Sequence, residues 1–381
     1  MLALRGGAEL VALWAQLLSV AEMVAGVALN GVGAGLSVLV AQTQLHDRQE
    51  LFLRRALLLG LSVSLPVAIV AALAGWMFVQ VVSPRTVAFA AAVGWIAVIH
   101  GLVNSFWLGQ QRRALMLGLG LATAGGALAA GAFAPDRLVL EMLVLAQAAP
   151  AIALLFVLPR AEAPKRADDR ALERYILPGV AIGVLSPLSL LLARTLVAHA
   201  LSWHESGVLQ ALWRMSDWIC GLAMGVLSVL YLPRMAAAYP QPGLGPVLRE
   251  SMKTVFAPAA VLFIVLFAFH RPLLATLYDE SFEASPLAVA LIFAGSLLRI
   301  AAWISLFGLY AALRTRAIAI GEFLSLPLFV VLAYALGERL TLEAAGALWL
   351  VTFAVYAAFN FWALRTPMTN RLATMIVAAR K

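Results

Sequence analysis

The 381-residue chain carries a formal net charge of +8, and 63% of its residues are hydrophobic while only 12% are charged. Soluble globular proteins average about 45–50% apolar and about 25% charged residues, so the composition excludes an ordinary soluble protein and predicts a polytopic membrane protein. The single cysteine, Cys220, excludes a disulfide framework and any metal cluster built on several thiolates.

Eleven apolar stretches are long enough to cross a membrane as helices, which takes about 20 residues for a hydrocarbon core of about 30 Å. Their continuous apolar character excludes barrel strands, which alternate in polarity. The predicted spans are 22–41, 56–82, 86–107, 114–133, 138–158, 176–199, 208–231, 255–277, 285–312, 317–336 and 343–364. The segment 8–20 before them is too short to span, so we expect an interfacial or re-entrant helix with Trp14 near the headgroups.

The basic residues between the spans predict the orientation of the chain. They gather in the first, third, fifth, seventh and ninth connections and in the C-terminal tail, while the alternate connections carry few. By the positive-inside rule these connections and the C-terminus are cytoplasmic. The high positive charge therefore reports topology and implies no nucleic-acid partner. Eleven spans then leave the N-terminus outside, and we expect one further span upstream of Met1.

The longest charged connection divides the spans into two groups. We predict an N-terminal bundle over 1–159, a cytoplasmic linker over 160–174, a C-terminal six-helix bundle over 175–366 and a cytoplasmic tail over 367–381. With one span added at the start the division is six plus six, and many secondary transporters consist of two such halves around a substrate path. The alternative is that this segment is simply a cytoplasmic loop.

Several enzyme classes are disfavoured by what the sequence lacks. The outer connections are short, whereas a membrane glycan polymerase or ligase needs a large periplasmic loop. No metalloprotease motif, nucleophile elbow or cluster of metal ligands occurs, so we predict neither catalytic nor metal-binding residues and no cofactor. The five scattered histidines are read as structural or interfacial. The run Gly31–Gly35 lies inside a span and predicts close helix packing or a local bend, not a phosphate loop.

Charged residues inside the spans are the candidates for function, because each costs at least about 2.5–3.5 kcal/mol at the bilayer centre. An arginine presents a planar fork suited to phosphate or carboxylate. We therefore predict that Arg194, Arg214 and Arg299 bind an anionic head group of the substrate. The alternatives are an Arg214–Asp217 pair along one helix face and structural pairing of the other two arginines with acids or backbone carbonyls.

Acidic and polar residues in the spans complete the predicted site. Asp217, Glu322 and Glu22 are candidates for charge pairing or for coupling to a proton or cation, with an interfacial position as the alternative for Glu22. Cavity-lining candidates are Asn30, Gln210, Trp213 and Ser216. These side chains can equally serve as hydrogen bonds between helices or, for the indole ring, as packing.

Several of these segments resemble one family of membrane transporters. The segments are Gly207–Asp217, Leu227–Met235, Ser186–Thr195, Gly295–Trp303, Leu29–Gly35 and Val40–Gln42. Together they resemble the Wzx-type flippases, in particular the lipid III and O-antigen translocases, of the multidrug/oligosaccharidyl-lipid/polysaccharide exporter (MOP) superfamily. The resemblance covers nearly the whole chain. Residues 5–20 resemble the segment after the family's first span, so the resemblance implies that this span is missing here.

The resemblance implies a fold and a function. Such flippases have two six-helix bundles around a central cavity and move undecaprenyl-pyrophosphate-linked oligosaccharides between leaflets of the bacterial inner membrane. It also implies membrane lipids as surroundings, and a glycan polymerase and chain-length regulator as partners. The alternatives are an ion-coupled exporter of small molecules from the same superfamily, a glycan polymerase or ligase, and a structural subunit of a glycan-assembly complex.

Overall fold

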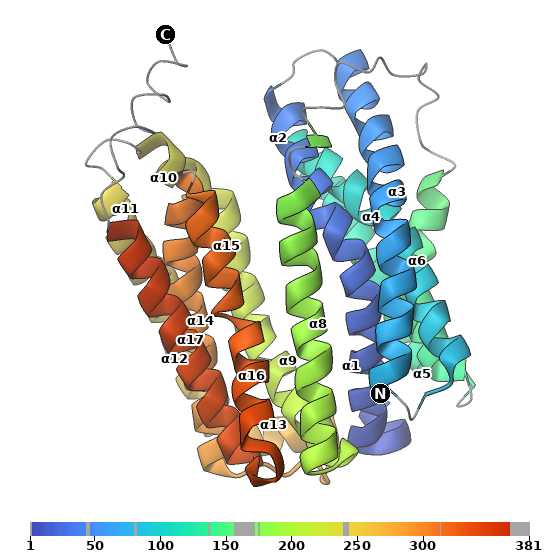
Figure 1. Ribbon diagram of the computed structural model, residues 1–381, viewed down its shortest axis with the longest axis vertical. Helices are drawn as coiled ribbons and strands as arrows, with labels where there is room; N and C mark the ends of the chain where they lie inside the picture. Colours follow the sequence, from blue (N-terminus) through green and yellow to red (C-terminus); the bar gives the residue numbers. More distant parts are fainter. Residues whose placement is uncertain are drawn as a thin grey trace. The chain divides into compact units, whose positions relative to one another are not determined.

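The computed structural model describes residues 2–42, 46–79, 82–135, 138–155, 172–173, 176–238, 244–312 and 314–365. Over these ranges the chain folds into helices joined by short connections and contains no strand, which confirms the predicted all-α class (Figure 1). The helices follow the apolar runs because a helix satisfies every backbone hydrogen bond within itself, as a hydrocarbon environment requires.

Long helices form the first half of the chain. They are α1 (Leu2–Val27), the π-helix η1 (Ala28–Gly33), α2 (Ala34–Gln42), α3 (His46–Phe78), α4 (Pro84–Gly109), α5 (Arg113–Phe133), α6 (Val139–Leu155) and α8 (Ile176–Ala200). The second half contains more interruptions. It comprises α9 (Trp203–Val226), the π-helix η4 (Leu227–Tyr231), α10 (Leu232–Ala238), α11 (Leu244–Ser251), the π-helix η5 (Met252–Phe256), α12 (Ala257–Ala268), α13 (His270–Leu277), α14 (Pro286–Ala311), α15 (Thr315–Phe323), α16 (Leu326–Leu336), the 3₁₀-helix η6 (Gly337–Arg339) and α17 (Leu342–Arg365).

Nine helices of the described part are long and apolar enough to cross a membrane. The first of them, Gly7–Ser37, corrects one prediction. The segment 8–20 does not form a separate interfacial helix, because it lies within α1 and continues without a break into the predicted first span. Its residues Ala12, Gln16 and Leu17 are fully buried against other helices, whereas an interfacial helix would leave one face in the headgroups.

The chain divides into two compact units. Unit 1 comprises residues 1–211, 271–284 and 329–342, and unit 2 comprises 212–270, 285–328 and 343–381. The predicted linker 160–174 lies outside the described residues except for Leu172 and Glu173, as does the tail 367–381. The predicted domain boundaries there remain predictions.

Glycines allow α1 and α8 of unit 1 to approach very closely. A Cβ atom added to Gly183 would lie 2.3 Å from the carbonyl carbon of Gly26, and one added to Gly179 would lie 2.4 Å from the Cα atom of Gly31. Small residues let membrane helices pack backbone to backbone, where dispersion contacts are densest. Gly31 packs against α8, which agrees with the close packing predicted for the run Gly31–Gly35, and the run begins within the π-helix η1.

The two halves of the chain repeat the same helix pattern. The sequence Ala-Leu-Trp occurs at 12–14 in α1 and at 211–213 in α9, an interval of 199 residues. The π-helices that interrupt these two helices begin at Ala28 and Leu227, which is the same interval. A π-helix inside an α-helix is rare and is often found at functional sites, so the repeated position of the interruption indicates related halves.

The following helices repeat at an interval of 202 residues. Ser83 caps α4 by accepting a hydrogen bond from the third residue along, and Ser285 caps α14 in the same way. The Thr86 hydroxyl donates to Glu141 on α6 (3.0 Å), and the Ser285 hydroxyl donates to Glu343 on α17 (2.5 Å). Since 83 and 285 are separated by the same interval as 141 and 343, α4 corresponds to α14 and α6 to α17.

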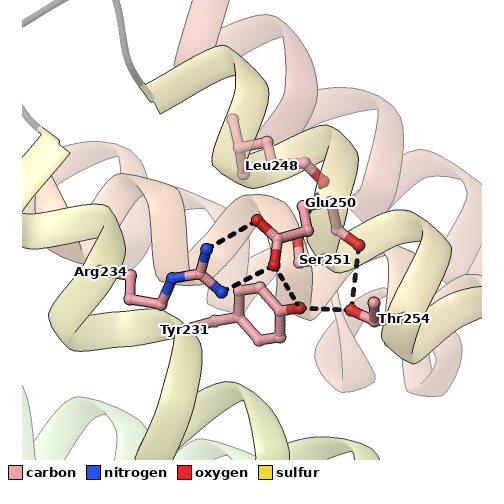
Figure 2. A network of polar contacts seen from close by, with 6 residues as sticks. All are labelled: Tyr231, Arg234, Leu248, Glu250, Ser251 and Thr254. Atoms are coloured by element: carbon pink, nitrogen blue, oxygen red, sulfur yellow. Dashed lines mark hydrogen bonds and ion pairs between the residues drawn. The ribbon is translucent and has the colours of Figure 1, made fainter.

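A polar network joins two π-helical segments of unit 2 (Figure 2). Arg234 of α10 donates two hydrogen bonds of 2.7 Å each to the Glu250 carboxylate of α11. The Tyr231 hydroxyl, at the end of η4, donates to the same carboxylate (3.4 Å) and bonds the hydroxyl of Thr254 in η5. The guanidinium also lies 5.3 Å from the centre of the Tyr231 ring. The network thus fixes η4 and η5 against each other.

Candidate functional site

An ion pair joins two helices of unit 2. The Nη2 atom of Arg299 on α14 donates a hydrogen bond of 2.6 Å to Oδ1 of Asp217 on α9. The two side chains differ in exposure, with 14% for Arg299 and 41% for Asp217. This is one of the pairings that the sequence left open for Arg299. The cation is the less exposed partner, and the carboxylate is the more exposed one.

Three aromatic rings surround the guanidinium of Arg299. Its central carbon lies 5.0 Å from the centre of the Trp303 ring and 5.7 Å from those of Trp349 and Phe353. Aromatic faces attract a cation within about 6 Å, by about 2 kcal/mol or more where water is excluded. The rings therefore hold the guanidinium in place and compensate part of its desolvation.

The rings are themselves held by a buried polar contact. The indole N–H of Trp349 donates to the hydroxyl of the fully buried Ser296 (3.0 Å), and the ring of Trp213 stacks on Trp349 with centres 4.7 Å apart. The thiol of Cys220 bonds the Ser296 carbonyl oxygen (3.7 Å). Trp213, a cavity-lining candidate, is thus a buried packing residue behind the ion pair.

The second acid of unit 2 lies further along the same aromatic series. Trp349, Phe353 and Tyr356 occupy one face of α17, because they are four and three residues apart. The Tyr356 hydroxyl donates to Oε1 of Glu322 on α15 (2.9 Å). Glu322 stands at the end of α15, close to the break at Leu324–Ser325. The ring series therefore connects the surroundings of Arg299 to those of Glu322.

Arg194 lies in a different setting, in unit 1. Its side chain is 4% exposed and donates to Gln210 Oε1 of α9 (2.7 Å), and to the Ala15 carbonyl (3.0 Å) and the Ser19 hydroxyl (2.6 Å) of α1. It thus ties α8 to α1 and to the first turns of α9. Gln210, another cavity-lining candidate, is a partner of this arginine.

The other predicted residues occupy less specialised positions. Arg214 is partly buried on α9, one turn before Asp217. Ser216 is buried and donates to the Leu212 carbonyl of its own helix (3.0 Å). Asn30 is exposed on η1 and donates to the Gly26 carbonyl (3.0 Å). In each of these two hydrogen bonds, the donor and the acceptor are four residues apart along the chain.

Unit 1 contains a cavity of about 280 Å³ between α1, η1 and α4. Its polar lining consists of Glu22, His100 and Asn104, and the rest of its wall is apolar. Glu22 is exposed, whereas His100 and Asn104 are partly buried. The cavity brings Glu22 together with polar residues of α4, which the sequence could not indicate because α1 and α4 are far apart along the chain.

Sequence reasoning missed the residues that complete these sites. They are His100, Ser296, Trp349 and Tyr356, and single polar or aromatic residues in apolar helices are too common to be informative. The spacing of Trp349, Phe353 and Tyr356 on one helix face was a usable signal. Nothing in the spacing, however, indicates which helix they face.

Comparison with known proteins identifies the fold. No model of a known protein family and no curated protein sequence matches the chain. A multidrug resistance MATE family transporter of the MOP superfamily, in its inward-facing conformation, matches with a TM-score of 0.71 and 13% identity over 94% of this chain and 90% of that one. The outward-facing form gives 0.67 and 15% identity, covering 96% and 89%. The lipid II flippase MurJ gives 0.57 and 9% identity, covering 94% and 86%.

Identities this low establish shared architecture only. The chain therefore shares the fold of these MATE family and MurJ structures.

Proposed function

We propose that this protein is a flippase that moves undecaprenyl-pyrophosphate-linked oligosaccharide across the bacterial inner membrane by alternating access, for O-antigen or enterobacterial-common-antigen-like polysaccharide synthesis. The transporter fold supports the general class. The resemblance of Gly207–Asp217 and Gly295–Trp303 to Wzx-type flippases supports the substrate. The observation that carries the proposal is the Asp217–Arg299 ion pair, because Asp217 lies in the first of these segments and Arg299 in the second.

The ion pair is suited to exchanging one anion for another. A pyrophosphate oxygen can replace the exposed carboxylate of Asp217 at the Arg299 guanidinium, and charge-assisted bonds of this type are roughly twice as strong as neutral ones. Leaving a buried charge without its partner costs about 3–5 kcal/mol. When no substrate is bound, the Asp217 carboxylate is the partner of the Arg299 guanidinium, so this cost does not arise. The pair thus keeps the arginine ready without leaving it unpaired.

The surrounding rings fix the direction in which the guanidinium points. Trp303, Trp349 and Phe353 lie within 5.7 Å of its central carbon, while its Nη2 atom donates to Asp217. A planar fork can bind two oxygens of one phosphate, which an ammonium group cannot do in the same way. The lipid tail remains in the bilayer, where its burial costs nothing.

The remaining charged residues have secondary roles in this proposal. Arg214 adds positive charge beside the pair, and Arg194 holds α8 to α1 and to Gln210 at the start of α9. Glu322, bound by Tyr356, is the group we assign to coupling with a proton or cation. The C-terminus faces the cytoplasm, and a glycan polymerase and chain-length regulator act on the product at the other face.

A second function is supported by a specific observation. The MATE neighbours are multidrug resistance transporters, and the cavity of unit 1 carries the carboxylate of Glu22. An ion-coupled exporter of small molecules would use such an acidic cavity. The arginines of unit 2 oppose this function for a cationic substrate, because they would repel it.

Reconstitution tests the proposal directly. Purified protein in liposomes is supplied with fluorescent undecaprenyl-pyrophosphate oligosaccharide, and the fraction accessible in the outer leaflet is measured over time. We expect flipping by the unaltered chain, a loss of at least tenfold for Arg299→Gln, and little change for Glu141→Gln, which removes a carboxylate elsewhere. Flipping by Arg299→Gln at the unaltered rate would refute the role of the pair. Transport of small cations without flipping would favour the exporter.

A further inference from the structure

The helix interruption that the two halves share is supported differently in each. By the interval of 199 residues, Gly26 and Gly31 of unit 1 correspond to Gly225 and Leu230 of unit 2. A Cβ atom added to Gly26 would lie 2.9 Å from the carbonyl oxygen of Gly183 on α8. One added to Gly225 would have no neighbour within 4 Å among the described residues. The same position is therefore packed against another helix in unit 1 and open in unit 2.

The π-helix η1 of unit 1 is held in place by backbone packing. Four of its six residues are buried, and they are Ala28, Gly31, Val32 and Gly33. A Cβ atom added to Gly179 of α8 would lie 2.4 Å from the Cα atom of Gly31, so the two backbones touch. Backbone atoms cannot move aside as flexible side chains can. A bend at η1 would therefore have to displace α8 as well.

Unit 2 has two π-helices side by side, and the first of them is half exposed. In η4 Leu227 and Tyr231 are buried, whereas Ser228, Val229 and Leu230 between them are exposed. The next helix of unit 2 is also interrupted, because η5 separates α11 from α12, while α3 of unit 1 contains no π-helix. Sharp helix bends occur mainly at prolines, at Gly/Ser pairs and at π-bulges. Both helices of unit 2 can therefore bend at the same level.

The short helices beyond the two π-helices, α10 and α11, are joined to each other, and we call them together the tip. The guanidinium of Arg234 on α10 donates to both oxygens of the Glu250 carboxylate on α11, at 2.7 Å each (Figure 2). A bidentate pair of this kind fixes orientation as well as distance. The two side chains are 50% and 44% exposed, so a movement of the tip would bury neither charge. The pair thus makes the tip one body.

The tip rests on α14, against which both of its helices pack. Met235 of α10 is fully buried. Gly308 of α14 leaves space for Leu248 of α11, because a Cβ atom on Gly308 would lie 3.4 Å from the Leu248 side chain. Apolar contacts of this kind are non-directional. The tip can therefore slide or tilt on α14 without leaving a polar group unpaired.

We propose that the tip is a gate of unit 2, which tilts as one body on the hinges η4 and η5 and so opens and closes the end of the unit at which it lies. The Arg234–Glu250 pair moves with the tip. The Tyr231 hydroxyl, bonded to Thr254 and Glu250, keeps the two hinges together. This inference goes beyond the proposed function, since the tilt is measured without substrate and its absence would leave the flipping test unaffected.

Distances between spin labels on the purified full chain test the tilt. With Cys220→Ser removing the native thiol, Gly221→Cys in α9 and Gly245→Cys in α11 place one label on each side of the hinges. Both positions accept a side chain, because a Cβ atom there has no described neighbour within 4 Å. We expect two populations of distances for this pair, and a single one for Gly221→Cys with Ile264→Cys, whose exposed side chain lies on α12 before the hinges. A single population for the first pair overturns the proposal.

Deletion of one exposed residue from each π-helix tests whether they are the hinges. A hydrogen bond from i to i+5 encloses one residue more than a bond from i to i+4, so deletion of Val229 and of Lys253 restores a regular helix and keeps the register on both sides. We expect the two populations to merge into one, whereas Val229→Ala, which shortens nothing, should retain both. Two populations after both deletions would overturn the role of the π-helices.

Hydrogen exchange of the unaltered chain gives a second test that needs no variant to fold. Amides over 227–231 should exchange about tenfold or more faster than those over 28–33, because η1 is fixed by α8 and η4 is not. Equal exchange of the two segments would show that η4 is as rigid as its counterpart, and it would overturn the proposal.

Discussion

Gly183 of α8 and Gly26 of α1 touch through their backbones, since a methyl group on Gly183 would lie 2.3 Å from the carbonyl carbon of Gly26. Backbone atoms cannot move aside as a flexible side chain can, so a substitution there must push two helices apart. The Gly183 position is therefore as restrictive as a buried core position, although it carries no side chain.

We expect Gly183→Ala to lower the thermal unfolding midpoint of the protein in detergent by many degrees or to prevent folding. Gly118→Ala in α5 is the matched control, because a Cβ atom at Gly118 has no neighbour within 4 Å. That change should leave the midpoint unchanged or raise it, since alanine is favoured over glycine in a helix by about 1 kcal/mol. Equal midpoints for the two variants would show that α1 and α8 are not packed through these glycines.

The Asp217–Arg299 pair should show strong energetic coupling. Arg299→Met and Asp217→Leu each leave one charge unpaired and should destabilise the protein, although by less than the about 3–5 kcal/mol typical of fully buried pairs, because Asp217 is 41% exposed. The double variant should recover part of the loss. Thermal unfolding midpoints of the four proteins form the double-mutant cycle, and additive effects would mean that the pair does not exist in solution.

Arg299→Lys tests the aromatic surroundings separately from the charge. Lysine keeps the charge but has no planar group to lie against Trp303, Trp349 and Phe353. We expect it to destabilise the protein and to slow flipping in liposomes. Full activity of the lysine variant would show that only the positive charge matters.

The hydrogen bonds of Arg194 should contribute to the stability of unit 1. Ser19→Ala and Gln210→Leu each remove an acceptor from a buried guanidinium. Each should cost about 1.5–3 kcal/mol, the usual contribution of a hydrogen bond to a charged group. Ser216→Ala is the control, because the Ser216 hydroxyl donates to the Leu212 carbonyl of its own helix. In a thermal unfolding assay Ser216→Ala should lower stability clearly less than Ser19→Ala does. A larger loss of stability in Ser216→Ala would contradict the stabilising role assigned to the hydrogen bonds of Arg194.

The network of Tyr231, Arg234 and Glu250 should limit the local opening of η4 and η5 (Figure 2). Glu250→Gln removes the charge that the arginine binds at two oxygens, so amide hydrogen exchange over 227–231 and 252–256 should become faster. Ser228→Ala removes a hydroxyl that donates to Gly225 within the same helix, and it should leave η5 unchanged. Unchanged exchange in Glu250→Gln would show that the π-helices do not depend on this network.

The sequence by itself determined the class of the protein and the position of most spans. Long continuous apolar runs have only one stable form in a bilayer, so the all-α class followed from composition and run length. The charged residues inside these runs were also evident, because their cost in hydrocarbon makes each of them conspicuous. The segment 8–20 was misassigned because it is too short to span a membrane alone, whereas in the structure it lies within α1 and its Gln16 is buried in a hydrogen bond to α8.

Only the tertiary structure decided which partner each charged residue has. Asp217 is three residues from Arg214 in the sequence, but the structure pairs it with Arg299, 82 positions away, because α9 and α14 lie against each other in unit 2. Likewise, Glu22 and His100 share a cavity only because α1 packs on α4. Periodicity tells which residues share a face of one helix, whereas the packing of small and large side chains between helices decides which faces meet.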